Sequence, residues 1–389
     1  GITQLESSFA GCKDMINIPI FSSVKAITSQ AFKQCYKLKK FECGDRLESI
    51  WSNGFDECRG LEEFITTSQS ITISGEAFIN CMSLKSFNFD IVTEVANNAF
   101  EGCSSLNTLD FSRSPITELP AQLFYNCGSF TQVILPPNIS EFSILVFEEC
   151  NVDSITFTSN GITTLDLTES FKEFDVEIKE VIFSSNCKVI LESTFSNCFN
   201  LTRVVLPETP FELINTFKYC SNLSEVINFQ YCTKIVGGFL SCSKLRELTY
   251  APNLNIIGDY SFYECESLNK FEFNDNISEL GDNSFYKCKE LTNIDLKNIK
   301  TVGSSAFRGC SKLSNAKINQ VETLGRFSFS ELQSLTTIEL PTTLKTMDSF
   351  CFMLSSIINI TGNPIGITQL ESSFAGCKDM INIPIFSSV

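Results

Sequence analysis

Cysteine is the residue type with the most chemical potential in this 389-residue chain, which has 18 cysteines and no histidine. Most of them stand three residues after a phenylalanine, as in Phe262–Cys265 and Phe285–Cys288. Such thiols could bind zinc, exchange electrons or form a ladder of disulfides between neighbouring repeats. A zinc site needs ligands in close pairs such as C-x-x-C, and the chain contains no such pair.

We therefore expect the cysteines to be buried thiols, because free cysteine packs in cores as a small hydrophobe. Disulfides remain the alternative, since equivalent residues in neighbouring coils lie about 5 Å apart. The cysteines outside this column stand where other repeats carry Leu, Phe or Ala, and we expect them in the core too: Cys43, Cys187, Cys232 and Cys351.

Catalysis is not expected from this sequence. Without histidine the chain lacks the commonest general base, the commonest metal ligand, and the Ser-His and Cys-His nucleophilic pairs. No glycine-rich phosphate loop and no G-x-S-x-G turn is present, and acidic residues are scattered along the chain. We expect neither a catalytic site nor a cofactor.

The phenylalanine itself recurs every 22 to 24 residues along the whole chain. It occupies positions 9, 32, 55, 78, 100, 124, 147, 171, 195, 217, 239, 262, 285, 307, 329, 352 and 374. A fixed period in this range is typical of a solenoid, in which each coil contacts only its neighbours. The hydrophobic content of 43% is sufficient for one continuous core.

A single coil can be followed from residue 257 to residue 285. Apolar residues alternate over Leu268-x-x-Phe271-x-Phe273, which predicts a short strand with one buried face. A turn follows at residues 274–276, Ile277 and Leu280 point inward, and residues 281–282 reverse the chain. The short segment 283–288 suits a single helical or 3-10 turn.

The resulting consensus, L-x-x-I-x-L-[P]-x-x-L-x-x-I-G-x-x-A-F-x-x-C-x-x-L, resembles the BspA-like class of leucine-rich repeats over the entire chain. The resemblance implies an α/β, right-handed leucine-rich-repeat solenoid of about 17 coils. It also implies parallel strands on the concave face and short helical or 3-10 turns on the convex side. Proteins of this class occur on the surfaces of oral bacteria and parasitic protists, in adhesion or host contact. Three coils depart from the consensus, with Phe174, Leu332 and Ser355 at the cysteine position.

The net charge of −16 argues against nucleic acid as a partner, because phosphate binding needs clustered Lys and Arg. No segment approaches the roughly 18 to 20 apolar residues of a membrane span. The chain opens on Gly1 inside a repeat, so we expect it to be a fragment of a longer protein. The resemblance favours a cell-surface or extracellular location.

The first 24 residues recur unchanged at 366–389, and the two copies begin 365 residues apart. We interpret 1–389 as a single solenoid without caps, carrying a 365-residue super-repeat. A segment cut from a long tandem assembly, with one coil present twice, is the second interpretation. A designed consensus protein is a third. Uncapped coil faces would favour end-to-end self-association.

One outward column of the predicted strands is apolar in the middle of the chain and polar toward its ends. A contiguous apolar stripe on an exposed face suggests a contact site for a protein or a surface glycan. The alternative is that β-branched residues are favoured in strands even where exposed. The candidate partner-binding residues are Ile134, Thr156, Ile182, Val205 and Ile227, with a charged border that includes Arg203, Glu225 and Glu247.

Two classes of function remain open. The first is a non-catalytic recognition or adhesion module that binds along its concave face. The second is a structural protein that forms long coiled or filamentous arrays from 365-residue units. The family resemblance favours recognition, and the recurrence of the first 24 residues favours the array.

Overall fold

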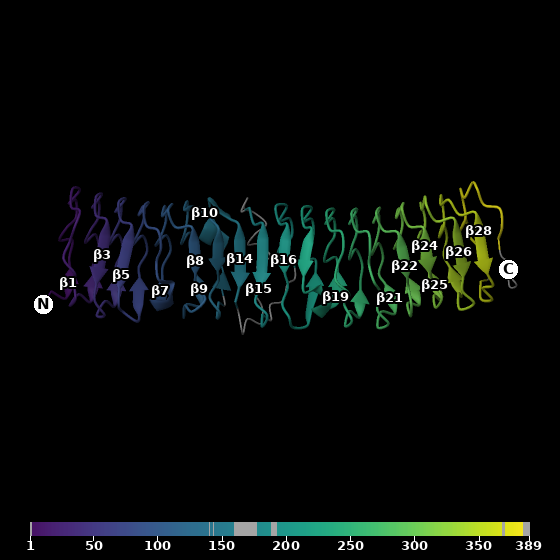
Figure 1. Cartoon of the computed structure of the whole chain (residues 1–389), viewed down its shortest axis with the longest axis horizontal. Helices are drawn as coiled ribbons and strands as arrows, with labels where there is room; N and C mark the ends of the chain where they lie inside the picture. The colour runs from purple at the N-terminus through teal and green to yellow at the C-terminus, as the bar shows by residue number, and fades with distance from the viewer. Residues whose placement is uncertain are drawn as a thin grey trace. The chain divides into compact units, whose positions relative to one another are not determined.

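The structure, a computed structural model, describes residues 2–139, 141–142, 144–158, 177–187, 193–367 and 370–383 (Figure 1). The chain forms two compact units, Gly1–Val189 and Ile190–Val389. Within each unit, strands of successive coils pair in parallel, which confirms the predicted leucine-rich-repeat solenoid. The repeat phenylalanine at position 171 and Phe174 lie outside the described residues.

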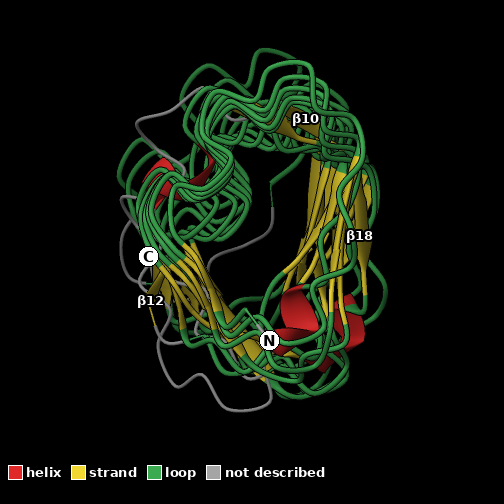
Figure 2. Cartoon of the chain, turned by 90° about the vertical axis from the view of Figure 1, so that its left-hand side faces the viewer, coloured by secondary structure: helices red, strands yellow, loops and turns green. Residues whose placement is uncertain are grey.

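Each regular coil contributes two strands, which gather on two different sides of the coil (Figure 2). We call these sides the long-strand face and the short-strand face. The long strand comes from the L-x-x-I-x-L part of the repeat. The short strand, often only two residues, precedes the reversal of the chain, as Glu279–Leu280 precedes Gly281. The short strand was not predicted from the sequence.

On the long-strand face of the first unit, β3 pairs with β5. Separately, β8 pairs with β11, β11 with β14, and β14 with β15. The strands of this face are β3 (Lys40–Cys43), β5 (Glu63–Thr66), β8 (Thr108–Asp110), β11 (Gln132–Ile134), β14 (Ser154–Phe157) and β15 (Glu180–Phe183). The short-strand face consists of β1 (Gln4–Leu5), β2 (Ala26–Ile27), β4 (Ser49–Ile50), β6 (Ile71–Ile73), β7 (Val92–Val95), β9 (Glu118–Leu119) and β12 (Glu141–Phe142). A further parallel pair joins β10 (Gly128–Phe130) to β13 (Cys150–Val152).

In the second unit, the long-strand face consists of three separate pairs. They are β16 (Arg203–Val205) with β18 (Glu225–Ile227), β22 (Asn293–Asp295) with β24 (Asn315–Lys317), and β26 (Thr337–Leu340) with β28 (Asn359–Gly362). The short-strand face is continuous through β17 (Phe211–Ile214), β19 (Cys232–Val236), β20 (Ile256–Ile257), β21 (Glu279–Leu280), β23 (Thr301–Val302), β25 (Thr323–Leu324) and β27 (Thr346–Met347).

The repeat phenylalanine lies on a third side of the coil, which we call the turn face. Residues two before and two after it have left-handed backbone, as Asn283 (φ +55°) and Lys287 (φ +54°) do around Phe285. The N–H groups of these three residues donate to carbonyl oxygens of the next coil, at 2.7 or 2.8 Å. Two 3-10-type bonds close the turn, from Tyr286 N–H to the Asn283 carbonyl oxygen and from Cys288 N–H to the Phe285 carbonyl oxygen, both at 3.2 Å. The alternation of left- and right-handed residues prevents this turn from continuing into a regular helix.

Short 3-10 helices also occur in the described part of the chain, and one of them ends at the repeat phenylalanine Phe147. They are η1 (Phe89–Ile91), η2 (Ile144–Phe147) and η3 (Phe229–Tyr231). Two of them, η1 and η3, run directly into the short strands β7 and β19, so they connect the long-strand face to the short-strand face.

The core is a stack of phenylalanine rings. Phe32, Phe55 and Phe78 are fully buried, and consecutive rings lie 5.1 to 5.2 Å apart and within 5° of parallel. Phe41 and Phe64 of the long strands meet Phe55 edge-on at 5.0 and 5.7 Å. Offset-stacked and edge-to-face geometry is favoured for aromatic pairs. The core therefore repeats one ring-on-ring contact from coil to coil.

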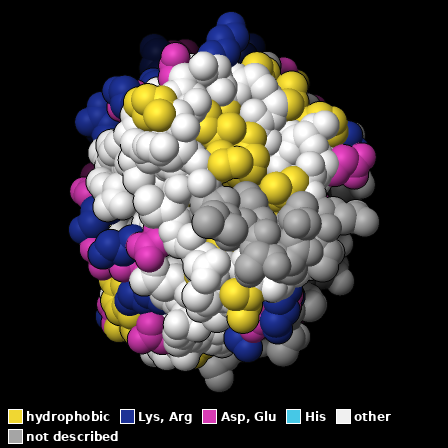
Figure 3. Space-filling view, turned by 90° about the vertical axis from the view of Figure 1, so that its right-hand side faces the viewer, with side chains coloured by type: hydrophobic (Ala, Val, Ile, Leu, Met, Phe, Trp, Pro, Cys, Tyr) yellow, Lys and Arg dark blue, Asp and Glu magenta, His cyan; other side chains and the backbone are white. Residues whose placement is uncertain are grey.

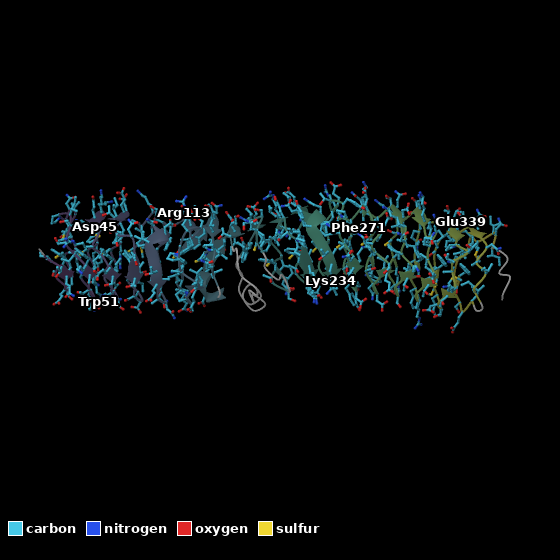
Figure 4. All side chains as sticks on the ribbon, turned by 90° about the horizontal axis from the view of Figure 1, so that it is seen from below. Asp45, Trp51, Arg113, Lys234, Phe271 and Glu339 are labelled. Atoms are coloured by element: carbon cyan, nitrogen blue, oxygen red, sulfur yellow. The ribbon has the colours of Figure 1, made fainter. Side chains whose placement is uncertain are left out.

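The strand predicted over Leu268–Phe273 does not form. Its side-chain directions are as predicted, because Leu268, Phe271 and Phe273 are buried (Phe271 is labelled in Figure 4). However, no backbone hydrogen bond joins residues 270–273 to residues 292–295, a stretch that the structure describes in full. Phe271 and Phe273 contact each other at 5.0 Å and both contact Phe285. Because two rings fill the core here, the backbone stays out of hydrogen-bonding reach of β22.

Candidate functional site

The prediction that the cysteines are buried thiols is confirmed for most of the column. Cys12 is exposed, and Cys198 and Cys377 are half-buried. The buried members are Cys35, Cys58, Cys81, Cys103, Cys127, Cys150, Cys220, Cys242, Cys265, Cys288 and Cys310. The four cysteines outside the column, Cys43, Cys187, Cys232 and Cys351, are buried as well.

The buried thiols also have a role that the sequence did not indicate. The Cys58 thiol donates to the Phe32 carbonyl oxygen of the preceding coil at 3.0 Å. The same oxygen accepts from the N–H of Cys35 at 3.1 Å, so both of its lone pairs are used. Ser355 stands at the cysteine position of its own coil and makes the equivalent bond to Phe329, at 2.8 Å. The column is therefore a line of small hydrogen-bond donors.

Hydrogen bonds with the Cys58 and Cys127 thiols lower the pKa of Cys35 and Cys150, but burial suppresses the reactivity of most other buried thiols. It raises the pKa of Cys310 to about 12 and holds the pKa of Cys103 well above the ordinary thiol value. A thiol must ionise to attack a disulfide or bind a metal ion. No group of three or more His, Cys, Asp or Glu side chains suited to a metal ion occurs among the described residues. The cysteine column is structural.

The candidate stripe falls in two groups, one in each unit. In the first unit, Ile134 pairs with Thr156, and Thr156 pairs with Ile182, across β11, β14 and β15. All three side chains are partly exposed. The Thr156 hydroxyl is covered and has no hydrogen-bond partner. Beside this column, the Ser154 hydroxyl donates to Glu180 at 2.9 Å.

In the second unit, Val205 pairs with Ile227 across β16 and β18, and both are partly exposed. The border residues Arg203 and Glu225 form an ion pair at 3.2 Å. Glu247 is exposed but belongs to no strand, because the long-strand ladder is interrupted after β18.

Sequence reasoning missed a cleft on the long-strand face of the second unit. The gap between residues 269–273 and β22 opens a cleft of about 590 Å³. Its rim carries Lys270, Glu272, Asp295 and Lys317, which form two ion pairs at 2.5 and 3.7 Å. The volume is in the usual range of ligand-binding clefts. The consensus could not reveal it, because the apolar pattern of these coils is regular.

Ion pairs connect side chains of adjacent coils on the surface, where Lys or Arg and Asp or Glu lie next to one another (Figure 3). Glu62 binds Lys39 of the preceding coil and Lys85 of the following coil, both at 2.6 Å. Hydrogen bonds to these two ammonium groups lower the pKa of Glu62 to about 2. Lys300, Glu322 and Lys345 repeat this arrangement in the second unit.

The exposure of the thiols predicts how the native protein reacts with Ellman's reagent. Cys12 should react at once, Cys198 and Cys377 more slowly, and the buried column only after unfolding in guanidinium chloride. The reason is that the reagent needs an accessible thiolate. Replacement Cys12→Ser should remove the fast phase. Rapid labelling of Cys265 or Cys288, identified by mass spectrometry, would contradict the assignment.

The ion pairs of Glu62 predict an acid-dependent loss of stability. A lowered pKa stabilises the folded chain above the ordinary carboxyl pKa, and this contribution is lost as the pH falls from about 4.5 toward 2. An NMR titration of the Glu62 carboxyl carbon should give a midpoint near 2, and Lys39→Met with Lys85→Met should raise it. Lys345→Met, in the other cluster, is the control and should leave it unchanged. A midpoint above 4 in the unsubstituted chain would refute the pairing.

No helix in the described residues is both long enough and apolar enough to cross a membrane.

The chain is similar to several solved structures of bacterial repeat proteins. A leucine-rich repeat protein from Bacteroides ovatus is 24% identical and has a TM-score of 0.47, with 81% of this chain and 82% of that chain covered. A leucine-rich cell surface protein from Faecalibacterium prausnitzii is 20% identical, with a TM-score of 0.32 and coverages of 76% and 83%. A leucine-rich repeat protein from Eubacterium ventriosum is 14% identical, with a TM-score of 0.38 and coverages of 83% and 84%. None of the curated proteins matches the chain.

The sequence profile of the BspA type leucine rich repeat region matches residues 4–107, 50–174, 117–237, 236–323 and 317–389. These overlapping matches extend over nearly all of the repeats described above. The chain therefore belongs to the BspA-type leucine-rich-repeat family.

Proposed function

We propose that this chain is a non-catalytic recognition module that binds a protein partner, or a glycan on a surface, along its long-strand face. We also propose that it works at a cell surface or outside the cell, in adhesion. The observation that carries the proposal is the column of partly exposed Ile and Val side chains on this face, with charged residues beside it. Apolar groups framed by polar ones are typical of contact sites.

The backbone beneath the stripe favours binding because it is already ordered. Ile182 and Val205 lie on hydrogen-bonded strands with fully buried neighbours such as Val181 and Val204. A partner would not have to immobilise this surface, so little conformational entropy would be lost on binding. The repeat family is typically used for protein interaction, which agrees with the proposal.

Replacement Ile227→Asp tests the long-strand face. We expect it to weaken binding at least tenfold, because a carboxylate would be desolvated within the contact. Binding would be measured by surface plasmon resonance against immobilised extracellular-matrix proteins and mucin glycoproteins, and as adhesion to cultured epithelial cells. Ile134→Asp and Ile182→Asp test the group in the first unit in the same way.

Ile256→Asp is the matched control, because Ile256 is an exposed isoleucine of the same unit on the short-strand face. It should leave binding unchanged, and circular dichroism should show both variants folded. Equal binding by Ile227→Asp, Ile134→Asp and Ile182→Asp, or no binding by the unsubstituted chain, would refute the proposal.

A structural array is the second candidate, and the unchanged recurrence of residues 1–24 at 366–389 supports it. In this case the 365-residue segment would be a building unit rather than a receptor. Light scattering with negative-stain microscopy distinguishes the candidates. A particle of 43.4 kDa would refute assembly by the purified chain, whereas coiled filaments of many times this mass would support it.

A further inference from the structure

The turn face of the second unit carries a strip of aromatic and cationic side chains that the proposed function does not use. We name it the aromatic–arginine ladder. It crosses five coils, with repeat phenylalanines at 262, 285, 307, 329 and 352. Its members are Tyr263, Tyr286, Arg308, Arg326, Phe327 and Phe350.

Each member contacts the next. The rings of Tyr263 and Tyr286 stack at 4.7 Å, and the Arg308 guanidinium lies 6.0 Å from the centre of the Tyr286 ring. The same guanidinium lies 5.0 Å from the Phe327 ring, and Phe327 stacks on Phe350 at 5.0 Å. The ladder is thus one continuous surface of Tyr, Phe and Arg, which are residue types enriched in protein interfaces.

Two phenylalanines of the ladder stand at positions where the backbone disfavours aromatic residues. Phe327 and Phe350 stand two residues before a repeat phenylalanine, where φ is +58° and +64°. The other described coils with left-handed backbone here fill this position with Asn, Gln, Ser, Glu or Gly, which include the residues that tolerate this backbone best, except for Tyr260 in the first coil of the ladder. A bulky aromatic residue is disfavoured there. Neither ring is buried in the core, so folding alone does not explain these two phenylalanines.

The charge of the ladder points to an anionic partner. Arg308 is held by Glu331, with Nε at 3.0 Å and Nη2 at 2.6 Å from one carboxylate oxygen. Arg326 is exposed and lies 4.9 Å and 5.4 Å from the Phe327 and Phe350 rings. Within the described ranges no carboxylate forms an ion pair with it. Stacking fixes the guanidinium plane and leaves its N–H edge free for a carboxylate.

A groove of about 620 Å³ runs beside the ladder. Its lining includes Lys287 and Glu331, which are not members of the ladder but contact it. Lys287 lies 5.1 Å from the Tyr286 ring. The groove is also lined by Lys378 and by Leu354, whose side chain is 45% exposed. The lining also includes Lys289 and Asp379, and Lys287 and Lys289 already pair with Glu264 and Glu266. Lys378 and the nearby Arg326 are therefore the cations that suit a carboxylate here, and the aromatic strip suits apolar side chains.

We propose that the aromatic–arginine ladder and this groove form a second docking surface, which binds an extended acidic segment of a protein. Neighbouring repeat phenylalanines in these coils are 5.0 to 5.7 Å apart, so the ladder is about 20 Å long. An extended peptide rises about 3.3 Å per residue, so about six residues would span it. Carboxylates of the segment pair with Arg326 and Lys378, and its apolar side chains lie on the rings. This surface is separate from the long-strand face and does not depend on the function proposed for that face.

The test uses the folded chain and a fluorescein-labelled decapeptide that alternates glutamate with valine, followed by fluorescence anisotropy. Matched peptides carry glutamine or lysine in place of glutamate. We expect binding of the glutamate peptide only, and a loss of at least tenfold in the double variant Phe327→Asn with Phe350→Asn. Arg326→Gln should weaken binding as well, because it removes the fork that pairs with a carboxylate.

The asparagine variants also separate a binding role from a structural one. Because Asn tolerates the left-handed backbone better than Phe, the double variant should keep or raise the melting temperature while it loses the peptide. Tyr219→Asn is the matched control, since Tyr219 is an exposed aromatic residue with φ +65° outside the ladder. Ile227→Asp is a second control on the long-strand face. Neither should change peptide binding.

Four outcomes of the peptide and stability measurements would overturn the proposal. They are no binding of the glutamate peptide, equal binding of the lysine peptide, unchanged binding by the double variant, and a lower melting temperature of that variant. Preferential binding of a sialylated oligosaccharide in competition with the peptide would also overturn it, since the carboxylate would then belong to a glycan.

Discussion

The hydrogen-bond ladder of the turn face determines how closely the coils approach one another. On this side, the N–H groups of alternate residues all point toward the next coil, as at Asn283, Phe285 and Lys287. This direction is possible only because left- and right-handed residues alternate around the repeat phenylalanine. These backbone hydrogen bonds hold the rings of the repeat phenylalanines about 5 Å apart, and the strands on the other two sides must pair at that spacing.

The strain in this turn is offset locally. A non-glycine residue in left-handed backbone costs roughly 1–2 kcal/mol, and a coil has two such positions. Burying one phenylalanine contributes about 1.5–3 kcal/mol, and ring stacking adds about 0.5–1.5 kcal/mol. The terms nearly cancel within each coil. Net stability therefore depends on the other inward residues and on the buried carbonyl bonds of the cysteine column, such as Cys58 to Phe32.

The sequence predicted the features that depend on which way a side chain points. The period of the phenylalanines indicated the solenoid, and Leu268, Phe271 and Phe273 are buried as expected. It did not predict where the hydrogen bonds between coils form a second set of strands or where they are broken. The short strands are too brief to show an alternating pattern. The missing backbone hydrogen bonds between residues 270–273 and β22 can be seen only in the structure. Of the candidate site, the stripe followed from side-chain alternation, whereas the aromatic–arginine ladder did not. Its contacts join residues far apart in the sequence, such as Arg308 and Phe327, which are 19 positions apart. The placement of the Phe327 ring on the surface depends on the left-handed backbone at this residue.

Inward residues and outward residues have separate roles in each coil, and this explains why one coil can present several independent surfaces. The core positions and the left-handed backbone recur in the coils that the structure describes, so they fix the framework and leave little room for variation. The outward residues of the long strand, such as Ile227, and those of the turn, such as Arg326, face different directions from that framework and share no contact. A substitution on one face therefore changes one surface without disturbing the other. Under the two proposals, a partner bound to the strand side would leave the turn side free, so the two sites would bind independently, without any conformational change linking them.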